Sequence, residues 1–341
     1  MKIDPSGSPL PGLTVAIAVL IVGLMSAFVI GQFPVAFGDV IKVVLAKLTG
    51  SVPDVTPQVE RVVLFVRGPR VLAAVMVGSA LATAGAAFQG LFRNPLVSPD
   101  ILGASSGAAF GAVIGFYFSL DIFAIQILAF LGGLAAVASV YLIGARLGGR
   151  DPVLMLVLIG VVVGALLGAG VGLVKYIGDP QSQLPLMTFW LLGGLDKVIA
   201  HDLLPLFVPV AIGIATLIAL RWRMNAMSLP EEEARALGLP TGRLRLVIIT
   251  AATLITAVSV AAAGVVGWVG LVVPHVARAL VGPDFSRLLP ATAILGGGYL
   301  LLIDTLARST RAGEIPLGIL TAVIGTPFFL WLLTRIQKTW S

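Results

Sequence analysis

The sequence predicts an all-α membrane protein that crosses the bilayer about ten times. Of its 341 residues, 58% are hydrophobic and only 11% are charged, whereas soluble domains usually carry about 25% charged residues. The mean hydropathy is +1.06, and apolar runs long enough to cross about 30 Å of hydrocarbon recur along the chain. A single soluble core could not bury so much apolar sequence, so we expect lipid to surround most of the protein.

Composition also excludes other classes of protein and site. The chain has no cysteine, so it can form no disulfide, thiolate metal site or cysteine nucleophile. Its formal net charge of +6 fits the basic cytoplasmic loops of membrane proteins better than a nucleic-acid partner, which we do not expect. The 40 glycines are typical of closely packed membrane helices.

Ten spans can be placed in order between polar, proline-containing or glycine-containing breaks. The first is longer than the core of a signal peptide, so we expect it to be retained as a span. The stretch around residues 95–120 is expected to contain a break. The predicted spans are residues 13–32, 62–90, 99–119, 122–146, 152–175, 201–221, 244–263, 265–282, 288–307 and 316–335.

An even number of spans puts both termini on one side of the membrane. That side carries the whole excess of positive charge in this arrangement, while the other side is neutral. The positive-inside rule therefore predicts that both termini are cytoplasmic. The basic residues on the predicted cytoplasmic side are Lys2, Arg93, Arg146, Arg150, Arg221, Arg223, Arg235, Arg243, Arg245, Arg278, Arg287, Arg335 and Lys338.

Three stretches between spans predict structure of their own. Residues 178–200 predict an outer loop with a short helix. Residues 221–245 predict a short cytoplasmic helix that begins with a capping box from Ser228 to Glu231 and ends at Gly238. Residues 33–66 predict an amphipathic helix on the outer membrane surface. Its apolar face comprises Phe37, Val40, Ile41, Val44, Leu45 and Leu48.

A short internal echo indicates an inverted repeat. Ala82-Thr-Ala-Gly85 precedes Pro95 by ten residues counted from the glycine, and Ala261-Ala-Ala-Gly264 precedes Pro274 by the same distance. In the ten-span arrangement the first copy runs inward and the second runs outward. Transporters with inverted-topology repeats have this property.

The sequence contains no recognisable motif for ATP hydrolysis or for metal-dependent catalysis. It lacks a G-x-x-x-x-G-K-[ST] phosphate loop and an H-E-x-x-H zinc motif. Ion-coupled carriers usually need ionisable residues within their spans. Asp304 is the main candidate, and we favour its pairing with Arg308 one helical turn later. A membrane enzyme is therefore remote, and a pore driven by a partner is favoured over an ion-coupled or passive carrier.

Blocks of sequence spread from about Leu13 to Leu333 resemble the FecCD-type permeases of bacterial ABC importers, in the order found in that family. The blocks are Arg67-Gly-Pro-Arg70, Phe88-Gln-Gly-Leu-Phe-Arg-Asn-Pro-Leu96, Gly103-Ala-Ser-Ser-Gly107, Phe189-Trp-Leu-Leu-Gly-Gly194, Gly264-Val-Val-Gly-Trp-Val-Gly-Leu-Val-Val-Pro-His-Val-Ala-Arg278, Glu314-Ile-Pro-Leu-Gly318 and Gly325-Thr-Pro327.

The resemblance implies a single transmembrane permease domain over residues 1–341, with the inverted-repeat fold of type II ABC importers. It implies a homodimer with the pore on its axis, two copies of a cytoplasmic ATP-binding subunit, and a periplasmic or surface substrate-binding protein. ATP hydrolysis would then occur in the partner, so the chain is expected to be no enzyme and to need no cofactor. The expected location is the bacterial cytoplasmic (inner) membrane.

The resemblance also gives the predicted cytoplasmic helix, at about residues 228–239, a role. It matches the family's coupling helix, which seats in a groove of the ATPase. The alternative from the residues alone is a solvated loop helix whose acidic first turn is favoured by the helix dipole. The coupling residues would be Glu231, Glu232, Ala234, Arg235, Leu237, Gly238 and Leu239.

Three outer arginines match positions that other family members present to acidic residues of the binding protein. Arg67, Arg70 and Arg308 all fall on the predicted outer side, where exposed charges would steer docking. The alternative is ordinary snorkelling at the membrane interface. Lys197 and Arg311 lie nearby, so the pairing with a partner stays open.

The cargo implied by the resemblance is a metal chelate, with a ferric siderophore or another iron complex first. Haem, cobalamin and molybdate stay alternatives, because no residue of the sequence indicates which cargo is carried. The almost wholly apolar fifth span resembles the family's pore-lining helix, but any buried helix would have a similar composition.

Overall fold

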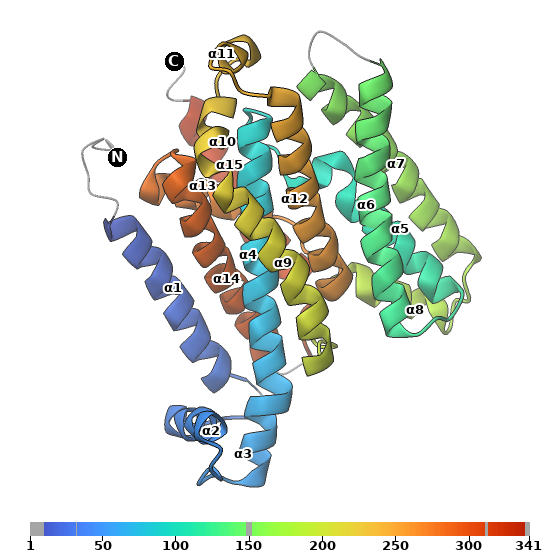
Figure 1. Cartoon of the computed structure of the whole chain (residues 1–341). Coiled ribbons are helices and arrows are strands. Elements are labelled where there is room, and N and C mark those ends of the chain that lie inside the picture. Colours follow the sequence, from blue (N-terminus) through green and yellow to red (C-terminus); the bar gives the residue numbers. More distant parts are fainter. Residues whose placement is uncertain (1–9, 32, 148–151, 311–312, 338–341) are drawn as a thin grey trace.

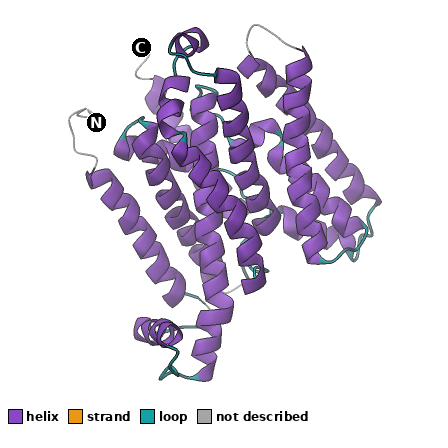
Figure 2. Cartoon of the chain, viewed as in Figure 1, coloured by secondary structure: helices purple, strands orange, loops and turns teal. Residues whose placement is uncertain are grey.

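The computed structural model describes residues 10–31, 33–147, 152–310 and 313–337, and these residues form helices without strands (Figures 1 and 2). The long helices run side by side in one bundle. The short helices α2 and α3 lie at one end of the bundle and α11 lies at the other, and these are called the α2 end and the α11 end below. α1 begins and α15 ends at the α11 end (Figure 1).

In the described part of the chain, seven helices are long and apolar enough to cross a membrane, and three shorter apolar helices accompany them. This confirms the all-helical membrane fold. The elements are α1 (Leu10–Val29), α2 (Phe37–Thr49), α3 (Pro57–Arg61), η1 (Val62–Arg67), α4 (Gly68–Leu91), η2 (Pro99–Leu102), α5 (Ala104–Tyr117), α6 (Ile122–Leu147), α7 (Pro152–Ile177), α8 (Gln183–Leu191), η3 (Ala200–Asp202), α9 (Leu203–Ala219), α10 (Arg221–Met227), α11 (Glu231–Ala236), α12 (Thr241–Ala263), α13 (Val269–Val281), α14 (Phe285–Ser309) and α15 (Leu317–Gln337).

Two of the predicted spans are only partly helical. α5 has 14 residues and α13 has 13, about 20 Å of helix each, which is too short for about 30 Å of hydrocarbon. Gly103 before α5 has φ 79° and Trp268 before α13 has φ 68°, so each helix follows a backbone break. The break expected near residues 95–120 is confirmed. The eighth span was predicted too long, because residues 264–268 are apolar but not helical.

The order of long and short helices occurs twice with opposite direction. α4, α5 and α6 are long, short and long, starting from the α2 end, and α12, α13 and α14 repeat this order from the α11 end (Figure 1). The inverted repeat is therefore visible in the order and direction of these six helices. The residues that suggested it are not equivalent in the structure, because Gly85 lies inside α4 whereas Gly264 lies in the break before α13.

The core consists of α4, α12 and α14. In their most apolar windows 72–78% of residues are buried, against 17–28% for α1, α6, α7 and α9. Glycines allow the core backbones to approach closely: Gly85 lies against Gly270 of α13, and Gly78 lies against Gly296 of α14. Such contacts supply packing energy where lipid offers no hydrophobic driving force between helices.

The predicted amphipathic helix is confirmed as α2, at the α2 end of the bundle (Figure 1). Val40, Val43 and Ala46 are buried against the chain. The rest of its apolar face stays open, with Leu45 54% and Leu48 78% exposed. The apolar face of α2 is therefore only partly covered by the rest of the chain.

Candidate functional sites

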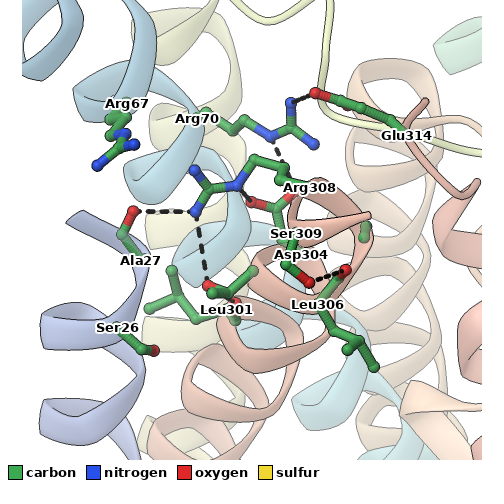
Figure 3. A network of polar contacts seen from close by, with 12 residues as sticks. Ser26, Ala27, Arg67, Arg70, Leu301, Asp304, Leu306, Arg308, Ser309 and Glu314 are labelled. Carbon is green, nitrogen blue, oxygen red and sulfur yellow. Dashed lines mark hydrogen bonds and ion pairs between the residues drawn. The ribbon is translucent and has the colours of Figure 1, made fainter. Parts of the chain in front are cut away.

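An ion cluster at the α2 end joins α4, α14 and the segment before α15 (Figure 3). Arg70 Nε donates to Asp304 Oδ1 at 2.9 Å, and Arg70 Nη1 donates to Glu314 Oε1 at 2.8 Å. Arg308 Nε donates to Asp304 Oδ2 at 3.0 Å. The predicted pair of Asp304 and Arg308 is thus confirmed, and Arg70 is a second partner that helical spacing could not reveal.

Two of the arginines also bind the end of α1 and the loop after it. Arg67 donates to the backbone carbonyl of Phe28 in α1 and to that of Phe33 in the loop, and Arg308 Nη2 donates to the carbonyl of Ala27 at 2.9 Å. The last carbonyls of a helix have no partner within it, so these guanidinium groups replace the water that would otherwise bind there. The cluster therefore links α1, η1, α4 and α14.

The prediction that the three arginines are exposed is wrong. Arg67 is 4% exposed, and Arg70 and Arg308 are each 7% exposed. Their guanidinium groups are bound within the protein, to the Asp304 carboxylate or to backbone carbonyls. The structure does bring the three together at one end of the bundle. Arg70 also lines a pocket of about 360 Å³, together with Lys197 and Glu314. Arg311, the other nearby cation, lies outside the described residues, as do Lys2, Arg150 and Lys338.

At the opposite end, α11 is a six-residue helix between α10 and α12 (Figure 1). Gly238 has φ 77°, and its amide donates to the Arg235 carbonyl at 2.9 Å, so the helix stops at the predicted glycine. The predicted capping box is wrong. The Ser228 hydroxyl donates to the Met224 carbonyl at 3.1 Å in α10, and Pro230, which precedes α11, offers no side-chain acceptor.

Glu231 ties α11 to the long helix α12. Its Oε2 accepts from Arg245 Nη2 at 2.9 Å and its Oε1 from Arg235 Nη2 at 2.6 Å. Burial alone would raise the pKa of Glu231, but the hydrogen bond and charge of Arg245, followed by those of Arg235, hold it below its usual value. Sequence reasoning missed Arg245, because it lies 14 residues away on another helix.

The two sides of α11 differ in exposure. Ala234 is 1% exposed and packs toward the chain, whereas Leu237 is 62% exposed. Glu232 and Arg235 are exposed as well, and Leu239 is half-buried. α11 therefore offers an apolar residue and charged residues to the outside while Ala234 and Glu231 hold it to the bundle.

A second polar region at the α11 end lies where α4, α10, α13 and α14 meet. Gln89 is 2% exposed, and its Oε1 accepts from Arg278 Nη1 at 2.6 Å. Both residues line a cleft of about 580 Å³ together with Arg93 and His275. The arginines expected on one side of the membrane, among them Arg93 and Arg278, thus gather at the end where α1 begins and α15 ends.

Comparison with known sequences decides the family. The sequence profile of the FecCD transport family matches residues 19–335. The chain belongs to this family.

The FecCD permease is 38% identical over 338 residues to the molybdate import system permease protein MolB of Haemophilus influenzae, covering 99% of this chain and 98% of that protein. It is 42% identical over 289 residues to the cobalamin import system permease protein BtuC of Halobacterium salinarum, covering 84% and 76% of the two chains. It is 40% identical over 285 residues to the hemin transport system permease protein HmuU of Yersinia pestis, covering 81% and 84%.

A solved structure gives the same assignment. An inward-facing conformation described as a "metal-chelate type ABC transporter" matches the FecCD permease with a TM-score of 0.85 at 37% identity, covering 95% of this chain and 98% of that chain. A chain of PsaBC from Streptococcus pneumoniae shares the fold alone, with a TM-score of 0.56 at 18% identity. The protein is therefore a multi-pass ABC importer permease, of a family that works with ATP-binding subunits and substrate-binding proteins.

Proposed function

We propose that this FecCD permease forms, as a homodimer in the bacterial inner membrane, the path through which an importer passes a metal chelate. An iron complex, such as a ferric siderophore, is the first candidate cargo. The observation that carries the proposal is α11, a short exposed helix held to α12 by Glu231 and Arg245. A helix bound in this way can pass the motion of an ATP-hydrolysing partner into a membrane span.

The ATP-binding subunit, in two copies, seats on the α11 end, which is cytoplasmic together with both termini. Leu237, the exposed charges of α11 and Gly238 face this partner. The gathering of arginines at this end supports the orientation, because basic residues collect on the cytoplasmic side. Since the chain has no phosphate loop, hydrolysis belongs to the partner, and the permease is not itself an enzyme.

The substrate-binding protein docks at the α2 end, near Arg67, Arg70 and Arg308. Support for this role is the pocket beside Arg70, whose rim carries the exposed charges Asp196 and Lys197. The side chain of Glu314 is 40% exposed, so a carboxylate of the binding protein could share Arg70 with it. The buried ion pairs would then hold the guanidinium groups in a fixed position for docking.

Molybdate is the second candidate cargo. MolB, which takes its name from molybdate import, matches this chain over nearly the whole length of both proteins. Relatives named for cobalamin and hemin match over shorter stretches, so these two cargoes stay alternatives. All four cargoes contain a metal, and delivery by a binding protein suits each of them.

Uptake into liposomes tests the proposal. The permease and its ATP-binding subunit are reconstituted with ATP inside, and binding proteins loaded with ferric siderophore, haem, cobalamin or molybdate are added outside. ATP-dependent accumulation of an iron chelate is the expected result. Accumulation of another cargo would replace the chelate in the proposal, and uptake that ignores ATP would replace the importer with an ion-coupled or passive carrier.

A further inference from the structure

Asp100 is a carboxylate at membrane depth that the outer ion cluster does not explain. It lies in η2, directly before α5. Its Oδ2 accepts from the Ser98 hydroxyl at 3.4 Å, and its Oδ1 accepts from the Ser105 hydroxyl. Among the described residues, no lysine or arginine forms an ion pair with it. Asp304, by contrast, has two arginine partners.

Backbone contacts on both sides of Asp100 give its depth. Ile101 lies against Gly160 of α7, and Pro99 lies against Gly270, which itself packs on Gly85 of α4. Gly160 is eight residues from the start of α7 and Gly85 is six residues from the end of α4. At 1.5 Å per residue, Asp100 lies about 9–12 Å below the α11 end of the bundle.

The side chain of Asp100 is exposed on the single chain, so in the membrane it must face either lipid or a space within the permease. A charge that faced hydrocarbon at this depth would be costly. Aspartates at such a depth usually face the interior of the bundle or a water-filled cavity. A space within the permease therefore suits Asp100 better than a lipid contact.

An open face of α7 continues from the contact of Ile101 with Gly160 toward the α2 end. A Cβ built on Gly164 would lie 4.0 Å from the Cα atom of Gly103. Gly168 and Gly172 follow one and two helical turns later in α7, and a Cβ built on either would meet no other atom within 4 Å. Asp100 thus lies at the inner end of an uncovered strip of small residues. A strip of this kind can border a path wide enough for a cargo.

We propose that Asp100 faces the water-filled translocation path and acts there as a charge filter that favours cationic and neutral cargo over anions. The inference rests on the proposed function and refines its cargo class. In a homodimer two copies of Asp100 face the same path, and paired carboxylates select for cations as acidic rings do in cation channels. A bare oxyanion such as molybdate is then the least favoured of the four cargoes.

The absence of native cysteine makes the first test direct. The importer, with its ATP-binding subunit, is placed in nanodiscs, and the D100C permease is treated with a charged, water-soluble methanethiosulfonate. D100C is expected to react quickly. V22C is the matched control, because Val22 is 56% exposed within α1, which lies at one edge of the bundle (Figure 1), where lipid should exclude the reagent. Equal, slow reaction of both variants would overturn the aqueous placement of Asp100.

The second test measures the filter itself. Ser106 lies beside the open face, with its Oγ 3.7 Å from a Cβ built on Gly164. In S106C, the ratio of reaction rates with a cationic and an anionic methanethiosulfonate is measured before and after adding D100N. Removal of a nearby unit charge in water-like surroundings predicts that D100N lowers the ratio about fivefold.

E314Q is the control for the second test, because it removes a charge at the far α2 end and should leave the ratio unchanged. A ratio that D100N does not alter would overturn the filter. Both labelling tests proceed without transport. Failure of the filter is therefore distinguishable from failure of the importer proposal, which the uptake experiment decides.

Discussion

Arg70 on α4 donates to Asp304 on α14 at 2.9 Å, across 234 residues of sequence. The carboxylate is fully buried, and its other oxygen accepts from Arg308. This bond joins two of the three core helices at the α2 end. A buried ion pair contributes little net stability over apolar residues, but its members depend strongly on one another, because either one alone is an uncompensated charge.

The D304N variant should therefore be much less stable than the wild type. It would leave the buried Arg308 without a carboxylate and Arg70 with Glu314 alone, and removal of one partner of a buried pair costs about 3–5 kcal/mol. Thermal unfolding of the permease in lipid nanodiscs checks this. E314Q, at a half-exposed carboxylate, is the matched control and should change stability by less than about 1 kcal/mol. Equal melting temperatures for D304N and the wild type would contradict the role of Asp304.

L237E should abolish co-purification of the ATP-binding subunit without unfolding the permease. Leu237 is 62% exposed on α11, so a charge there costs the free chain little, while an interface core excludes charge. L45E, at an exposed apolar residue of α2, introduces the same charge at the opposite end and should keep the partner bound. Retention of the subunit by L237E would count heavily against α11 as the coupling helix. Ala234 is a poor test position because it is buried.

The bond between Glu231 and Arg245 should make the attachment of α11 depend on pH. The pKa of Glu231 in the folded protein lies below its usual value. Its contribution is therefore complete above the unfolded pKa of about 4.3 and is lost as the pH falls through the lower, folded value. E231Q should lower stability by about 1–2 kcal/mol at pH 7, and this difference should shrink below about pH 4. Unfolding of both proteins across this pH range measures it. A difference that stays constant would show that the charge of Glu231 is not involved.

G85A should destabilise the contact between α4 and α13. A Cβ on Gly85 would overlap the backbone of Gly270, and overpacking of this kind costs about 1–3 kcal/mol. G168A provides the control, because a Cβ there meets nothing within 4 Å. Melting temperatures of the two variants in nanodiscs should therefore separate. Equal values would mean that α4 and α13 can move apart without loss.

Docking of the binding protein is tested best at Lys197. Reversal of Arg67, Arg70 or Arg308 to glutamate would disrupt buried contacts and confuse docking with folding. Lys197 is exposed on the rim of the same pocket, so K197E should weaken binding of the binding protein at low salt and leave the ATP-binding subunit attached. Since exposed charges are screened, the effect should fade as salt rises. Binding that K197E leaves unchanged at low salt would remove this pocket as the docking site.

Sequence patterns could predict the features that depend on near neighbours. Hydropathy placed the spans, the glycine at position 238 ended α11, and helical spacing paired Asp304 with Arg308. The same reasoning failed at Ser228 and at the start of α13. A hydroxyl can choose between local acceptors, and an apolar residue such as Val266 is equally suited to a helix and to a buried break.

The all-helical membrane fold and the approximate positions of its apolar helices were already contained in the order of residues, because both depend on composition and on short-range periodicity. The burial of Arg67 and Arg70, the bond from Glu231 to Arg245 and the contact of Ile101 with Gly160 were decided only by the tertiary structure. Each of these depends on which distant backbones approach one another. That choice is made by the packing of whole helices, through contacts such as Gly85 with Gly270, and no local pattern encodes it.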